Sequence, residues 1–92
     1  MSEIAGKALK YIESITAVLS DLKTKHSLQA DDVQYVLDTA ERYVSDAQYY
    51  LQKDDASTAL ASVSYAEGLL DALKFLRHIN FEWPTKKVKE TA

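Results

Sequence analysis

Apolar residues recur every three or four positions along three separate stretches of this chain. Such spacing places apolar side chains on one side of an α-helix, which repeats every 3.6 residues. The pattern predicts helices over about residues 3–25, 30–53 and 56–78. The predicted core positions are Ile4, Ala8, Tyr11, Ile15, Val18 and Leu22 in the first helix, Val33, Leu37, Ala40, Val44, Ala47 and Leu51 in the second, and Ala59, Val63, Ala66, Leu70 and Leu73 in the third.

Polar segments interrupt the pattern at residues 26–32 and 53–58. In the second segment Asp54, Asp55 or Ser57 can accept a hydrogen bond from the free amides that begin the third helix. Short connections between helices of similar length favour antiparallel neighbours. The sequence therefore predicts an all-α fold, an up-and-down antiparallel three-helix bundle.

The chain has 92 residues, which is enough for one domain. Two glycines and one proline, against 47% hydrophobic residues, favour long helices over strands and hairpins. We expect the bundle to occupy residues 1–80. Residues 81–92 then form a short C-terminal tail, partly ordered near Phe81 and Trp83.

The third predicted helix carries a second series of small and apolar residues on the side opposite its core positions. Gly68 lies in this series, and a glycine inside a helix costs about 1 kcal/mol relative to alanine. Its presence suggests that a side chain here would obstruct a close neighbour. The candidate neighbours are the chain's own tail, through Phe81 and Trp83, and a helix of a second copy or of a partner. The remaining interpretation is that this helix is the most buried of the three and that Gly68 is merely tolerated. The predicted interaction surface consists of Ala61, Tyr65, Gly68, Ala72, Phe75 and Ile79.

Two acids, Glu67 and Asp71, lie four residues apart and therefore share one side of this helix. We expect a positive charge to compensate these two negative charges. In an antiparallel hairpin Arg42 comes close to Glu67, which predicts structural ion pairs among these three residues. A divalent metal is the weaker alternative because no histidine stands at ligand spacing on this side.

The ingredients of an active site are missing from the sequence. There is no cysteine, and the two glycines, Gly6 and Gly68, cannot build a phosphate-binding loop. No serine lies in a Gly-x-Ser-x-Gly turn. His26 and His78 fall at predicted helix ends, where a histidine commonly interacts with the terminal carbonyls. The sequence predicts a protein that is not an enzyme, with no catalytic residue, cofactor or metal.

The charge distribution bears on the partner. The net charge is −3; residues 30–71 hold nine acids and two basic groups, whereas residues 72–92 hold five basic groups and two acids. Tyr35 and Tyr49 point away from the core, but the acids around them would repel a phosphate backbone. We expect a protein partner or a homo-oligomer and not a nucleic acid. No apolar run reaches the roughly 18 residues of a membrane span, and the lack of cysteine favours the cytoplasm.

The segment "RYVSDAQYYL" followed by "TALASVSYAEGLLDAL" resembles a small archaeal family of uncharacterised helical proteins, catalogued as domain of unknown function 357. The "YAEGLLD" run, residues 65–71, carries most of the likeness. The resemblance implies a closed, up-and-down three-helix bundle in an archaeal, intracellular setting. It implies no activity and no site residues. The same segment is also similar to helical domains associated with nucleotidyltransferases.

Together these observations predict a non-catalytic helical module that works by self-association or by docking on a larger protein. The alternative is a small helical adaptor or substrate-binding subunit that holds RNA or a nucleotide beside a partner enzyme. An affinity for RNA that falls steeply with salt would favour the alternative.

Overall fold

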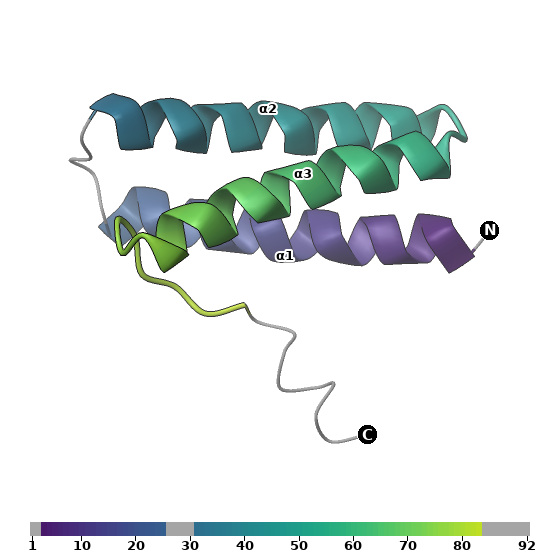
Figure 1. Ribbon diagram of the computed structural model, residues 1–92. Coiled ribbons are helices and arrows are strands. Elements are labelled where there is room, and N and C mark those ends of the chain that lie inside the picture. The colour runs from purple at the N-terminus through teal and green to yellow at the C-terminus, as the bar shows by residue number, and fades with distance from the viewer. Residues whose placement is uncertain (1–2, 26–30, 84–92) are drawn as a thin grey trace, which may run out of the picture.

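The computed structural model describes residues 3–25 and 31–83 and contains three α-helices (Figure 1). They are α1, Glu3–Lys25; α2, Asp31–Gln52; and α3, Ala56–Phe75. Successive helices run antiparallel, so the all-α, up-and-down three-helix fold is confirmed. His26, at a predicted helix end, and Ser27, which the sequence offers as a possible cap of the second helix, lie outside the described residues.

The predicted apolar faces meet in a single core. Alanines occupy its centre, with Ala40 and Ala47 of α2 and Ala59 and Ala66 of α3 all fully buried. Because these side chains are short, they allow the axes of the two helices to approach closely. Ile4 is an exception among the predicted core positions, since it is 42% exposed at the start of α1. The largest fully buried side chains are Ile15, Leu22, Val63 and Leu70.

The turn between α2 and α3 is built from two aspartates. Asp54 has a left-handed backbone with φ of 64°. The amide of Asp55 donates to the carbonyl of Tyr50 at 2.9 Å, which closes the end of α2. The Asp55 carboxylate accepts from the amide of Thr58 at 3.2 Å and so caps the start of α3. Of the three residues predicted to cap this helix, Asp55 does so.

Helix α3 ends at Phe75, three residues before the predicted end at residue 78. Arg77 has φ of 66°, and its amide donates to the carbonyl of Lys74 at 3.0 Å. The amide of His78 donates to the carbonyl of Leu73 at 2.9 Å. This pair of bonds is a helix-terminating motif in which the left-handed residue is usually glycine. Because an arginine takes this position instead of a glycine, the sequence did not indicate that the helix ends here.

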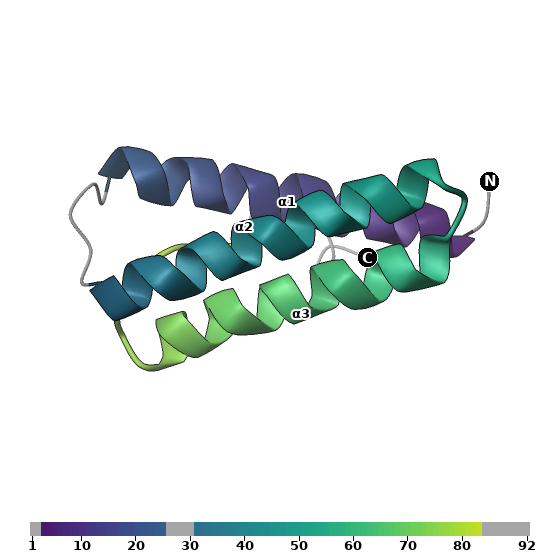
Figure 2. The ribbon, with the colours of Figure 1, turned by 90° about the horizontal axis from the view of Figure 1, so that it is seen from above.

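Residues 79–83 follow this turn and are called the strap here. Ile79, Phe81 and Trp83 are 6%, 6% and 8% exposed, whereas Asn80 and Glu82 between them are exposed. This alternation is typical of an extended segment with one side buried. The strap crosses the side of the bundle that faces away from α2 (Figures 1 and 2). Residues 81–83, assigned to the tail by the sequence, therefore complete the core.

Candidate interaction surface

The predicted second series on α3 lies on an exposed side of the helix. Ala61, Tyr65, Gly68, Ala72 and Phe75 are all exposed, and we call these five residues the outer face of α3. Tyr65 is 53% exposed and Phe75 is 76% exposed. Two large aromatic side chains thus stand in solvent on either side of two small residues, Gly68 and Ala72, and Ala61 lies one turn before Tyr65.

Ile79 does not belong to this surface, and its assignment there was wrong. The helix ends before Ile79, and the left-handed turn at Arg77 redirects the chain into the strap, where Ile79 is only 6% exposed. Leu76, which the sequence analysis did not assign to this surface, is 67% exposed directly after the helix. Its position next to Phe75 extends the apolar surface at this end of α3.

The strap covers a different side of α3, which we call the covered flank. The three charged residues of the helix, Glu67, Asp71 and Lys74, all lie there at spacings of four and three residues. Asp71 accepts a hydrogen bond from the indole nitrogen of Trp83 at 2.9 Å. The Lys74 ammonium lies 4.9 Å from the ring centre of Phe81. Of the candidate neighbours of the second series, Phe81 and Trp83 therefore lie on a different side of α3.

The outer face of α3 carries no charge. Over Ala56–Phe75, which the structure describes completely, the polar side chains that share this exposed side are those of Ser57 and Ser64. An added Cβ at Gly68 would meet nothing within 4 Å. Among residues 3–25 and 31–83, no neighbour therefore requires a glycine there, contrary to the interpretation that a close neighbour in the fold excludes a side chain. Within this part of the chain the cost of Gly68 has no compensation.

Tyr65 marks the border between the outer face and α2. Its ring lies 4.6 Å from that of Tyr43, tilted by 54°. On α2 itself, Tyr35 and Tyr49 are 67% and 55% exposed, as their positions predicted. The Lys53 ammonium lies 5.6 Å from the Tyr49 ring centre. Aromatic side chains therefore continue from α3 across the exposed side of α2.

The contacts of Asp71 and Arg42 bear on the predicted ion pairs among Arg42, Glu67 and Asp71. Asp71 contacts Trp83, and the Arg42 guanidinium lies 3.4 Å from the Thr39 hydroxyl on its own helix. Glu67 shares the covered flank with Asp71, whereas Tyr65 contacts α2 from the other side of α3. The ion pair between Arg42 and Glu67 stays a prediction. The position of Glu67, on the side of α3 away from the Tyr65 contact with α2, does not favour it.

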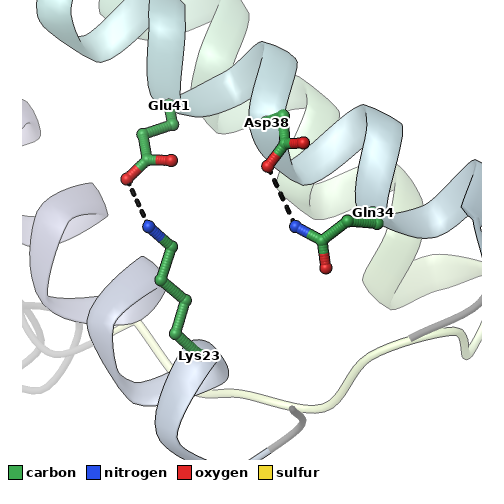
Figure 3. A network of polar contacts seen from close by, with 4 residues as sticks. All are labelled: Lys23, Gln34, Asp38 and Glu41. Atoms are coloured by element: carbon green, nitrogen blue, oxygen red, sulfur yellow. Dashed lines mark hydrogen bonds and ion pairs between the residues drawn. The ribbon is translucent and has the colours of Figure 1, made fainter. Parts of the chain in front are cut away.

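Polar side chains also connect α1 with α2 (Figure 3). Lys23 and Glu41 form an ion pair at 2.6 Å, with side chains 57% and 45% exposed, and Gln34 donates to Asp38 at 2.9 Å along α2. Such exposed pairs contribute less than about 1 kcal/mol. A shallow hollow of about 290 Å³ beside them is lined by both Lys23 and Glu41.

Residues 10–79 match the model of a family described as Protein of unknown function (DUF357). The chain belongs to this family. The matched region includes the whole outer face of α3 and ends at Ile79, before Phe81 and Trp83 of the strap. Searches of curated proteins and of solved structures found no match.

The family description names no activity, so inference about function rests on the surface. Within the described residues no three His, Cys, Asp or Glu side chains are grouped so that they could hold a metal ion. None of the three helices combines the length and apolar character needed to cross a bilayer.

Proposed function

We propose that this protein is a non-catalytic helical module that works by protein contact through the outer face of α3. The observation that carries the proposal is an exposed helix side without charge, bordered by Tyr65 and Phe75 at 53% and 76% exposure. Contiguous exposed apolar surface commonly marks a contact site.

The composition of α3 supports this proposal. A side of a helix that carries large apolar residues and no charge is normally buried. The core covers one side of α3, and the strap covers the flank with Asp71 and Lys74. No part of the chain that the structure describes covers the outer face. A partner would bury it and would also account for Gly68, because a glycine lets another backbone approach closely.

The charges of the neighbouring helix favour a protein partner over RNA. The exposed rings of Tyr35 and Tyr49 lie on the helix that also exposes Asp38 and Asp46. These carboxylates repel phosphates, and the net charge of −3 adds to the effect. A chain without cysteine fits the reducing cytoplasm, which is the compartment that we propose.

A photo-crosslinking side chain at position 72 tests the proposal in the native cell. Ala72 lies on the outer face of α3, and Ala17 of α1, also exposed, is the matched control. We expect position 72, and not position 17, to yield a defined protein adduct. The same adduct should disappear when Phe75→Asp is added to the chain.

Two results would count against the proposal. Equal yields from positions 72 and 17 would show that the outer face has no preferred partner. An adduct with RNA, together with an affinity for RNA that falls steeply with salt, would instead favour the nucleic-acid adaptor.

A further inference from the structure

We infer that the partner of the outer face of α3 is a second copy of this chain, packed antiparallel about a twofold axis close to Gly68. This inference rests on the proposed function and names its partner. The resulting contact is isologous, with the same side chains contributed by both copies.

The order of large and small side chains along α3 supports the twofold arrangement. With the axis at Gly68, a residue seven positions after it faces the residue seven positions before it in the other copy. Phe75, 76% exposed, then lies over the exposed Ala61 of its neighbour. Four positions away, Ala72 faces Ser64, so two small side chains meet. The two large side chains thus fill the space left by two small ones.

A parallel arrangement lacks this complementarity. It would place Phe75 against Phe75 and Ala61 against Ala61, with crowding at one end and a gap at the other. Gaps and overpacking both weaken an interface. At the axis of the antiparallel pair Gly68 faces its own copy. An added Cβ there meets nothing within 4 Å in the single chain, so the second helix can approach.

The charges at the two ends of α3 also favour the antiparallel orientation. Asp54 and Asp55 are exposed at its start, and Arg77 and His78 are exposed at its end. Within one chain these ends lie about 30 Å apart, at 1.5 Å per helical residue. With the axis at Gly68, Arg77 and His78 of one copy lie opposite residues 59 and 58 of the other, three to five residues, or roughly 5–8 Å along the axis, from its Asp55 and Asp54. Opposite charges across an interface favour this register and orientation.

The expected affinity is modest. One helix face from each chain buries less than the roughly 1,600 Å² of a standard interface. Area alone does not determine affinity, but a surface of this size is typical of micromolar or weaker binding. The dimer should therefore dissociate on dilution, which makes its equilibrium directly measurable.

Sedimentation equilibrium of the full chain, up to about 1 mM, tests the inference. We expect a monomer–dimer equilibrium that Phe75→Asp weakens at least tenfold, a change of about 1.4 kcal/mol. Leu9→Asp is the matched control, because Leu9 of α1 is also a large exposed apolar residue, at 46%. It should leave the equilibrium unchanged. Circular dichroism of both variants verifies that they fold.

A charge exchange tests the orientation. Arg77→Glu and Asp54→Lys are made in separate chains, and each chain alone should dimerise more weakly than the wild type. Mixing the two should restore dimerisation, because Glu at position 77 of one chain then lies within roughly 8 Å, along the helix axis, of Lys at position 54 of the other. The two positions lie too far apart within one chain to interact, so restoration reports a contact between chains.

The outcomes separate this inference from the proposed function. A wild-type chain that stays monomeric at the highest concentration overturns the second copy as partner. If position 72 still crosslinks to a different protein in the cell, the proposed function stands without the dimer. A dimer that is insensitive to Phe75→Asp overturns the contact surface, and a charge exchange without restoration overturns the antiparallel orientation.

Discussion

The covered flank and the outer face of α3 border the same core but have opposite compositions. All three charged residues of the helix, Glu67, Asp71 and Lys74, lie on the flank that the strap covers. The outer face, which is exposed, has no charged residue. A surface helix in a monomer usually shows the reverse, with its charges in water and its apolar side chains covered.

The charges of the covered flank have local partners, which explains their position. Asp71 accepts from the indole of Trp83, and Lys74 lies over the ring of Phe81. Both side chains thereby hold the strap against α3. By contrast, the outer face of α3 has no charged residue although it is exposed to solvent. The exposed side of α2 carries Asp38, Arg42 and Asp46. This difference supports the proposed contact through the outer face.

Removing the largest side chain of the strap should produce the largest difference between the two sides. Trp83→Ala deletes an indole that is 8% exposed and should lower the free energy of unfolding by about 3–5 kcal/mol. Phe75→Ala on the outer face, where the ring is 76% exposed, should change it by less than about 0.5 kcal/mol. Urea unfolding followed by circular dichroism, at concentrations where the chain is monomeric, measures both. Equal losses would mean that the outer face is packed within the chain.

The hydrogen bond of the covered flank should give an intermediate effect. Asp71→Ala leaves the Trp83 indole N–H without its acceptor, which should cost about 1–3 kcal/mol. Asp71→Asn keeps a carbonyl oxygen at the same place and should lose less. Emission from Trp83, the single tryptophan, should be blue-shifted in the wild type and shift toward the red in Asp71→Ala. Equal losses of unfolding free energy in Asp71→Ala and Asp71→Asn would show that the hydrogen bond to Trp83 does not cause the destabilisation.

The smallest effect is expected at the centre of the outer face. Gly68→Ala should raise the free energy of unfolding of the monomer by about 0.5–1 kcal/mol, because alanine favours the helix and its Cβ has free space. Gly6→Ala in α1 is the matched control, since a Cβ there also meets nothing within 4 Å. Under dimerising conditions only Gly68→Ala should weaken association. A destabilised Gly68→Ala monomer would mean that α3 has a close neighbour within its own chain.

The sequence predicted the helices and the exposed positions of α3 well, because both depend on the 3.6-residue period. It did not predict the end of α3, since a left-handed Arg77 gives no signal comparable to glycine. Ile79 continued the helical spacing and was therefore placed on the wrong surface. The alternation of apolar and polar residues in "INFEW", residues 79–83, was the available signal for the strap.

The position of the strap in the chain has a consequence for synthesis. Helices α1, α2 and α3 all leave the ribosome before Phe81 and Trp83, so the nascent bundle has an apolar side that its own chain has not yet closed. The α2–α3 hairpin forms from contacts local in sequence, which form quickly. Closure by the strap therefore follows the folding of the three helices, and until it occurs the part of the core that Ile79, Phe81 and Trp83 join is open to solvent.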